Sequence, residues 1–323
     1  VEVTIKPLLS DVYLQALYSG GSRWREVVKG YTGRILMLLG ARRFDVIIIE
    51  KELFPFMPAI AERFLQLIGV PYVADYDDAL FHRYDRHANP WIRRLLGQKI
   101  DSVMRCATTV IAGNNYLAER AQRAGANRVE IIPTVVDTER YQPKRKSGSD
   151  TLIVGWIGTP QTSRYLKPLL PVFESLKKEM PVRFVAVGAN SEDFENTPVE
   201  AWPWSEGSEV ESVQQFDVGI MPLVDSPWER GKCGYKLIQY MACGVPVVAS
   251  PVGVNLEIVD TGANGLLAES VDEWEQALRQ LVQAAPSERK RMGEVGRSQV
   301  EGWYSRQAQE PRLLSLIRSA SRP

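Results

Sequence analysis

The sequence predicts an α/β protein with two Rossmann-like domains whose parallel sheets face each other across a cleft. The first observation is length, because 323 residues are about twice the usual size of one domain. The second is the alternation of short apolar runs with longer helical patterns, which is typical of β-α-β units. The third is a polar stretch near the middle, after which the alternation starts again. Clefts between domains are preferred ligand sites.

The first domain is expected over residues 1–140. The run VIII at 46–49 is continuously apolar, as expected of a strand buried on both faces of a parallel sheet. The predicted strands are 3–5, 45–49, 72–75, 108–112 and 129–132, and the predicted helices are 24–39, 57–67, 92–106 and 116–124.

A linker is expected at 141–150, because YQPKRKSGSD is polar, rich in Pro, Gly and Ser, and without periodicity. The second domain then covers 151–299, and an amphipathic helix in 300–323 is expected to return to the first domain. Predicted strands of the second domain are 153–157, 183–187, 218–222, 246–249 and 265–268, and its predicted helices are 165–178, 210–215, 234–243, 271–284 and 286–295.

The amino-acid composition disfavours several classes of protein. Lys and Arg equal Asp and Glu at 39 each, so there is no basic excess to favour a nucleic-acid partner. The three cysteines, Cys106, Cys233 and Cys243, do not form a disulfide framework, which favours a reducing cytoplasm. His82 and His87 are the only histidines, and we expect both at the surface rather than on zinc. No apolar run approaches the ~20 residues of a membrane span, and no signal peptide is visible.

The segment 228–253, WERGKCGYKLIQYMACGVPVVASPVG, carries the strongest chemical signal. Gly231 and Gly234 give a flexible backbone just before a helix, whose first N–H groups have no partners within the helix. Such a helix start at the carboxyl end of a parallel sheet is a natural phosphate site, and Lys232 and Lys236 add cations. A basic loop before an ordinary amphipathic helix accounts for the same residues equally well.

MACGVPVVAS, together with four further segments in the same order, resembles the family 4 (group 1) glycosyltransferases. The other segments are IIPTVVDTERYQP, LIVGWIGTPQTSRYL, FDVGIMPL and GANGLLAE. The resemblance covers nearly the whole chain. It implies the GT-B fold, hexosyltransferase-type activity with a nucleoside-diphosphate sugar as co-substrate, retention of anomeric configuration and no metal or other cofactor. Lys, Arg and helix N-termini then neutralise the leaving diphosphate.

The resemblance also implies donor-site residues. Gly158 and Thr159 lie where the family's loop approaches the diphosphate, although many members have Arg in place of Thr159. Arg164 falls where many members have a phosphate-binding Lys. Gly234 and Tyr235 start the helix whose amides meet the diphosphate.

The family's paired-glutamate motif is altered in this chain. Its second Glu, which usually holds the ribose hydroxyls, falls on Gln239. Its first Glu falls on Gly231, and Glu229 is a candidate substitute. Lys232 is interpreted as compensation for the missing Arg. The stretch EAWPWS at 200–205 lies where the family's backbone reads the base. Trp202 or Trp204 is a candidate to flank the base, although plain packing is as common for such residues.

Acidic residues follow the predicted strand 72–75. Asp75, Asp77 and Asp78 contain the Asp-x-Asp pattern of the other glycosyltransferase fold, GT-A, but the other matches outweigh a metal role. A plainer interpretation is that one Asp caps the next helix. Asp77 falls where the family presents a His to the donor sugar, and a carboxylate there can steady positive charge at the anomeric carbon. Asp77, Lys232 and Arg164 are therefore the catalytic candidates.

Two charged segments of the first domain are candidates for other contacts. Glu50, Lys51 and Glu52 follow a strand and are expected on the acceptor side, although a solvated charged turn accounts for them equally well. The basic stretch Arg23–Arg43 is a candidate for peripheral contact with anionic lipid at the inner face of the membrane, and a lipid-linked acceptor would suit it. A solvated helix face is the simpler interpretation of that stretch.

The sequence begins after the first strand of family members, so we expect the first sheet to lack a strand and the chain to be less stable than a longer relative. Two alternatives to a transferase stay open. One is a GT-B-like nucleotide-sugar epimerase, and the other is a non-catalytic nucleotide-sugar-binding protein. A dinucleotide oxidoreductase is disfavoured, because no GxGxxG follows a strand.

Overall fold

The computed structural model describes residues 2–10, 12–13, 24–144 and 151–322, which group into two compact α/β units. Unit 1 comprises Val1–Ala112, Leu117–Ile131 and Ser315–Pro323, and unit 2 comprises Gly113–Tyr116 and Ile132–Leu314. Of the predicted linker, residues 145–150 lie outside the described part, and Tyr141 is buried in unit 2. The predicted α/β class with two parallel sheets is confirmed.

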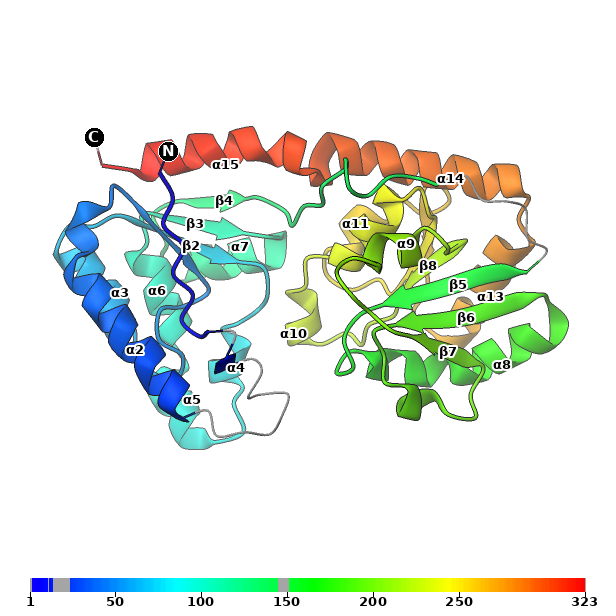
Figure 1. Ribbon diagram of the computed structural model, residues 1–323, viewed down its shortest axis with the longest axis horizontal. Coiled ribbons are helices and arrows are strands. Elements are labelled where there is room, and N and C mark those ends of the chain that lie inside the picture. The colour runs from blue at the N-terminus through cyan, green and yellow to red at the C-terminus, as the bar shows by residue number, and fades with distance from the viewer. Residues whose placement is uncertain (1, 11, 14–23, 145–150, 323) are drawn as a thin grey trace. The chain divides into compact units, whose positions relative to one another are not determined.

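Unit 1 is built on a parallel sheet with the strand order β1-β2-β3-β4. Each strand pairs with the next along the chain, so this sheet has no internal gap (Figure 1). The strands are β1 (Ile47–Glu50), β2 (Tyr72–Tyr76), β3 (Thr109–Ala112) and β4 (Val129–Ile131), and the helices are α2 (Trp24–Leu39), the short 3-10 turn Ala41–Arg43, α3 (Ile60–Leu67), α4 (His82–Asp85), α5 (Pro90–Leu96), α6 (Lys99–Cys106) and α7 (Asn115–Arg123).

The prediction of a strand at 3–5 was wrong. Val3 and Ile5 are 73% and 82% exposed and join neither sheet. Two alternating apolar residues do not make a strand without a neighbour that offers hydrogen bonds and a surface to cover.

The predicted helix 92–106 is two helices, and an unpredicted short helix precedes them. The helix α5 starts at Pro90, after Asn89 accepts a hydrogen bond from the Trp91 N–H at 2.9 Å. The chain then leaves the helix at Gly97, where a Cβ would lie 2.3 Å from the Arg93 carbonyl oxygen. In α4, the side chain of His82 is buried against Phe81 and contacts Asp85 at 2.8 Å, so the surface position predicted for His82 was wrong.

Unit 2 contains a six-stranded parallel sheet with the order β10-β9-β8-β5-β6-β7. The chain adds β6 and β7 on one side of β5, and then β8, β9 and β10 on the other. Open α/β sheets bind ligands outside the carboxyl ends of the strands where the order reverses in this way, which here is between β5 and β8. The strands are β5 (Leu152–Ile157), β6 (Val182–Val187), β7 (Val199–Trp202), β8 (Val218–Met221), β9 (Val247–Ala249) and β10 (Gly265–Leu267), of which β7 was not predicted.

Helices cover both faces of this sheet (Figure 1). The 3-10 helix Ser163–Leu169 replaces the first five residues, 165–169, of the predicted helix 165–178. The others are α8 (Leu170–Glu179), the 3-10 turn Ser191–Phe194, α9 (Glu209–Val213), α10 (Pro227–Arg230), α11 (Tyr235–Ala242), α12 (Asn255–Ile258), α13 (Val271–Gln283), α14 (Pro286–Gln299), the π-helical turn Val300–Tyr304 and α15 (Arg306–Ala320).

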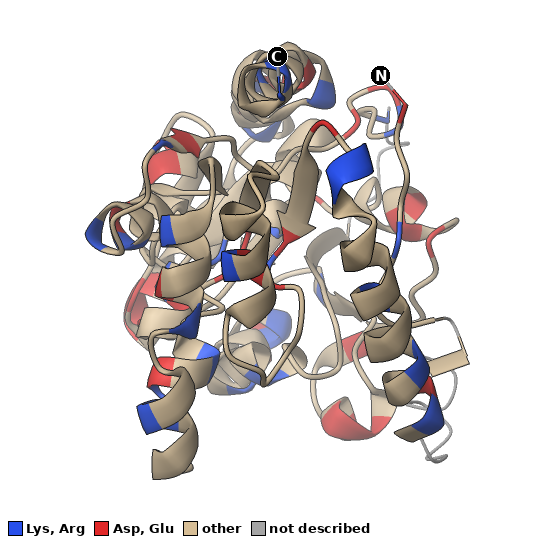
Figure 2. Ribbon diagram, turned by 90° about the vertical axis from the view of Figure 1, so that its left-hand side faces the viewer, with Lys and Arg blue, Asp and Glu red and all other residues tan. Residues whose placement is uncertain are grey.

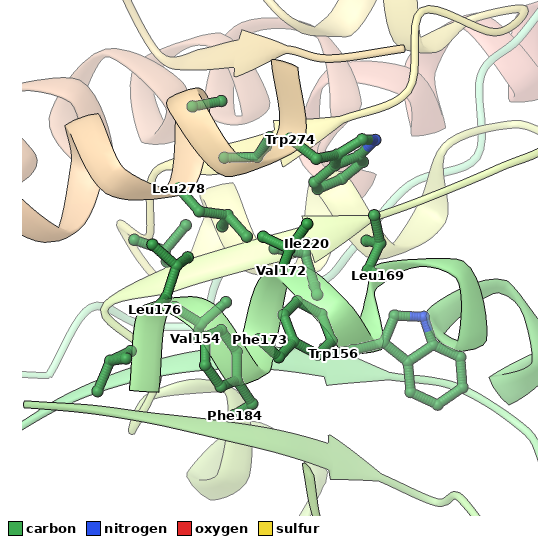
Figure 3. Packing of buried hydrophobic residues seen from close by; sticks show 14 of the residues in the cluster. Val154, Trp156, Leu169, Val172, Phe173, Leu176, Phe184, Ile220, Trp274 and Leu278 are labelled. Atoms are coloured by element: carbon green, nitrogen blue, oxygen red, sulfur yellow. The ribbon is translucent and has the colours of Figure 1, made fainter. Parts of the chain in front are cut away.

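Two hydrophobic clusters hold the helices of unit 2 onto the sheet. On one face, Phe173 of α8 stacks on Phe184 of β6 at 4.3 Å between ring centroids, and Trp274 and Leu278 of α13 complete the layer (Figure 3). On the other face, α11 is almost wholly buried, with Leu237 and Ile238 at 0% exposure. Burial on both faces accounts for the continuously apolar strands.

The last helix belongs to both units. The strand-like bridge between Val136 and Ser305 fixes the start of α15 in unit 2. At the other end, Arg322 donates hydrogen bonds from its side chain to the carbonyls of Gly69 and Arg42, and Arg128 reaches Ser319, all within unit 1. None of the described helices combines the length and the apolar character that a membrane crossing requires.

Replacing Gly155 with alanine is expected to destabilise unit 2. A Cβ on this β5 residue would lie 2.2 Å from the ring of Phe216, which is fully buried and has no room to move. We expect a loss of about 2 kcal/mol in the free energy of unfolding, typical of overpacking a core, measured by urea denaturation. The control is Gly207→Ala, where no atom lies within 4 Å of the new Cβ. Equal stability of the two variants would contradict the steric explanation.

Candidate functional site

Backbone loops at the carboxyl ends of β5 and β6 approach each other closely. The Gly158 N–H donates to the Val187 carbonyl at 3.0 Å, and the Gly188 N–H donates to the Trp202 carbonyl at 2.9 Å. Gly188 has a φ of +80°, and a Cβ there would lie 2.3 Å from the Gly158 oxygen. Thr159 starts a tight turn, since its N–H donates to Oγ1 of Thr162 at 3.1 Å. The missing side chains of these two glycines therefore allow the loops after β5 and β6 to pack directly against each other.

The helix α11 begins beside this edge of the sheet. Its N-cap is Gly234, with a left-handed φ of +68°, and no side chain in the described part of the chain caps the helix start. A Cβ at Gly234 would lie 2.3 Å from Cδ1 of Ile258, so glycine is needed for both conformation and space. The uncapped first turn and the helix dipole together favour an anion at this point.

Asn114 fixes the loop that carries Lys232. Its side-chain amide donates to the carbonyl oxygens of Gly231 and Lys232, each at 3.0 Å, and the residue is 3% exposed. Lys232 itself is half-buried and forms no ion pair with any described carboxylate. Asn114 was not predicted as a site residue, although its place in the turn directly after the buried strand β3 is a signal from which it could have been found.

Glu229 and Arg164 meet through an unpredicted residue, Tyr165. The Glu229 carboxylate is buried and accepts from the hydroxyls of Tyr165 and Ser226. Arg164 donates to the Tyr165 oxygen at 3.2 Å and lies over its ring. Burial, with the hydrogen bond to Glu229, raises the pKa of Tyr165. Both Glu229 oxygens are therefore engaged within the protein, and Glu229 supports the position of Arg164.

The predicted base and ribose residues share one carboxylate, that of Glu209. Trp204 donates its indole N–H to Glu209 at 2.8 Å, and the Gln239 amide donates to it at 3.1 Å. Tyr141 also donates to Glu209 and accepts from Gln239 at 2.9 Å. The sequence linked neither Glu209 nor Tyr141 to this group, because they lie 30 and 98 residues from Gln239.

Tyr235 and Lys236 occupy the first turn of α11. The Tyr235 ring is 42% exposed, and partial burial of its hydroxyl raises its pKa. The Lys236 ammonium lies 5.6 Å from the centre of the buried Trp156 ring, which is a cation-π distance. Lys236 therefore joins the first turn of α11 to the Trp156 ring of β5.

In unit 1, the carboxyl ends of β1 and β2 bring Lys51 to Asp77. Glu50 is in register with Asp75, and Lys51 follows with a left-handed φ of +67°. The Lys51 ammonium lies 3.2 Å from Asp77 and 3.9 Å from Glu50. In the described residues, no group of three His, Cys, Asp or Glu side chains is arranged to hold a metal ion. The N-cap residue of α4 is Phe81 rather than one of the three aspartates.

Glu52 points away from its neighbours and into the core of unit 1. Its side chain is 4% exposed and forms a buried ion pair with Lys99, which also donates to the Phe54 carbonyl. Tyr84 donates to Glu52 at 2.8 Å. A charge this deeply buried needs such partners, so Glu52 braces the turn after β1 and is not exposed to an acceptor.

Two models of known protein families match this chain, one in each half. Residues 151–284 match the model described as glycosyl transferases group 1, and residues 12–134 match the one described as glycosyl transferase 4-like domain. A D-inositol 3-phosphate glycosyltransferase of Stackebrandtia nassauensis is 28% identical over 193 residues, which is 51% of this chain and 43% of that protein. The chain thus spans less than half the length of this curated relative.

Solved structures of low sequence identity share the fold. Sucrose-phosphate synthase from Thermosynechococcus elongatus superposes with a TM-score of 0.67 at 17% identity, covering 92% of this chain and 79% of that one. HepE of Anabaena, solved in complex with UDP, gives a TM-score of 0.70 at 15% identity, covering 88% and 82%. The architecture of the chain is therefore GT-B.

The acidic edge of unit 1 predicts a pH-dependent stability. Burial, together with the nearby carboxylates of Asp77 and Glu50, raises the pKa of Asp75 to about 6. A folded-state pKa above the unfolded value means that the protonated form stabilises the fold, and this stability is lost as pH rises from about 4 to about 6. One pKa unit corresponds to about 1.4 kcal/mol, so Asp75→Asn should gain about 2–3 kcal/mol over the wild type at pH 7.5 but little at pH 4. Urea denaturation at both pH values measures this, and an equal difference at both would refute it.

Proposed function

Because the chain belongs to the group 1 glycosyl transferases, we propose that it moves a sugar from a nucleoside-diphosphate sugar to an acceptor. In this proposal, unit 2 binds the donor and unit 1 binds a sugar or lipid-linked acceptor in the cytoplasm. The reaction is a metal-independent hexosyl transfer that retains the anomeric configuration and uses no cofactor. No nucleic acid takes part. The supporting observation is the uncapped start of α11 at Gly234, with Lys232 in the adjoining loop.

The chemical task of this site is to stabilise the diphosphate as it leaves. The first-turn amides of α11 present N–H groups, which stabilise anions without reorganising. Lys232 supplies a cation that no described carboxylate neutralises, and Tyr165 orients Arg164. We assign Asp77 the separate task of steadying positive charge at the anomeric carbon, with Lys51 setting its position.

The two alternatives differ from transfer in their products. An epimerase would alter the nucleotide sugar with no acceptor present, and a binding protein would leave it intact under all conditions. A thermal-shift screen against nucleoside diphosphates and their sugars first selects the donor, because a ligand that binds the folded state raises its apparent stability. Product analysis with and without an acceptor panel then separates the three activities.

Lys232→Ala is expected to reduce nucleoside-diphosphate release from the selected donor about a hundredfold, mainly in kcat. The reason is that Lys232 acts on charge that grows as the diphosphate leaves. The control is Lys290→Ala on α14, which removes an exposed lysine paired with Glu294 at 3.4 Å and should leave the rate unchanged. An unchanged rate for Lys232→Ala, with wild-type stability, would remove Lys232 from the mechanism.

A peripheral contact with the membrane is a second proposal, and it is supported by exposed apolar residues on α2. Trp24, Val28, Ile35 and Leu39 are 73%, 43%, 53% and 74% exposed, and their spacing places them on one face of the helix. Arg23 lies outside the described residues, and the side chain of Arg34 is occupied by the Lys6 carbonyl. Figure 2 shows Lys and Arg in blue and Asp and Glu in red along the helices, with uncharged residues between them. Lys29 is paired with Glu26 at 2.7 Å, so we expect insertion of these apolar side chains, helped by Arg25, to contribute more to membrane binding than basic charge does.

Sedimentation with lipid vesicles tests this contact. We expect the protein to bind vesicles of phosphatidylcholine with phosphatidylglycerol more than vesicles of phosphatidylcholine alone. The double variant Ile35→Glu, Leu39→Glu should lose this binding, whereas Leu256→Glu, an exposed position of unit 2, should keep it. Binding that survives the double variant would exclude α2 as the contact.

A further inference from the structure

Glu209 joins three parts of unit 2 that are distant in sequence. Its carboxylate accepts from Tyr141, which precedes β5, from Trp204, which follows β7, and from Gln239 in α11. The Trp204 hydrogen bond ends on one carboxylate oxygen, and those of Tyr141 and Gln239 end on the other. One charged group thus sets the positions of an aromatic ring and an amide.

This contact determines which way the Gln239 amide faces. A carboxylate can only accept hydrogen bonds, so the atom 3.1 Å from Glu209 must be the amide nitrogen. The same nitrogen donates to the Tyr141 oxygen at 2.9 Å, which uses its second hydrogen. The carbonyl oxygen of Gln239 therefore points away from Glu209 and Tyr141.

The Gln239 oxygen remains available as an acceptor. Gln239 is 3% exposed, and its oxygen has no hydrogen-bond donor in the described part of the chain. Among the described residues, two polar side-chain atoms are both fully buried and without a hydrogen-bond partner, namely the Tyr76 hydroxyl and Oδ1 of Asn255. The Gln239 oxygen is not one of them, so it is not completely closed off from solvent.

Trp204 presents a ring in a fixed position beside the glycine loops. Its Cβ is 3.2 Å from the place of a Cβ on Gly188, and its indole N–H is held by Glu209. The residue is still 51% exposed. A half-exposed indole that is anchored at its edge offers a face for stacking a planar ring.

We propose that Glu209 is a positioning residue for nucleoside recognition. It holds the Trp204 ring for the base and turns the Gln239 oxygen toward a ribose hydroxyl. This inference rests on the proposed function, because it assumes that the donor's nucleoside binds at this edge of unit 2.

Binding measurements on two kinds of ligand test the proposal. UDP, GDP and ADP are compared with inorganic pyrophosphate, which carries the charge of the diphosphate but no nucleoside. With the nucleotide that binds wild type most tightly, Glu209→Gln should raise the dissociation constant about tenfold and leave that of pyrophosphate unchanged. The control Glu206→Gln removes an exposed carboxylate from the same loop and should change neither constant.

A charge exchange tests the pairing itself. Gln239→Glu places a second carboxylate against Glu209 and should weaken nucleotide binding at least tenfold. Adding Glu209→Gln to it restores one donor and one acceptor, so the double variant should return to within about threefold of wild type. The same coupling should appear in the urea unfolding of the four ligand-free proteins.

The outcomes distinguish this inference from the function on which it rests. If wild type binds a nucleotide but Glu209→Gln weakens nucleotide and pyrophosphate equally, or weakens neither, the role of Glu209 is overturned and the donor site stands. A double variant no better than Gln239→Glu also overturns the role of Glu209. If wild type binds no nucleoside diphosphate, the proposed function and this inference are both overturned.

Discussion

The left-handed turn at Gly234 is the constraint on which the candidate site depends. With a φ of +68° and Ile258 pressed against the missing Cβ, only glycine allows the chain to enter α11 in this direction. The turn aims the first helical amides along the carboxyl edge of the sheet. It also sets the loop before the helix, where Asn114 holds two carbonyl groups and leaves Lys232 in position. One helical turn further on, Gln239 reaches Glu209 from the buried side of the same helix.

The sequence predicted the strands of both sheets well, and the physical reason lies in burial. A parallel strand covered on both faces is continuously apolar, so β2, β3 and β8 stand out from their surroundings. The strand β7 was missed, because three of its four residues are only half-buried and a proline follows it. The predicted strand at 3–5 was wrong for the opposite reason, since the alternation there has no neighbouring strand to pair with.

Main-chain features of the site were predictable, but the supporting side chains were not. A glycine just before a predicted helix indicates a close backbone approach or a left-handed conformation, and Gly234 has such a conformation, whereas Gly158 came from the family resemblance. A polar partner carries no comparable signal, because any Asn, Tyr or Glu suits many positions. Asn114 and the loop that it holds are separated by 117 residues, and only the fold joins them. The same holds for Tyr165, whose hydroxyl lies between Arg164 and Glu229.

The division of α15 between the units affects how the protein is made. Its first part continues unit 2, and Ser315–Pro323 belongs to unit 1. The hydrogen bonds from Arg322 to Gly69 and Arg42 therefore form only after unit 2 has been translated and residue 322 has left the ribosome. Expressing the two units from separate genes would likewise separate the sheet of unit 1 from Ser315–Pro323. Unit 1 thus includes a segment of polypeptide that is translated only after the whole of unit 2.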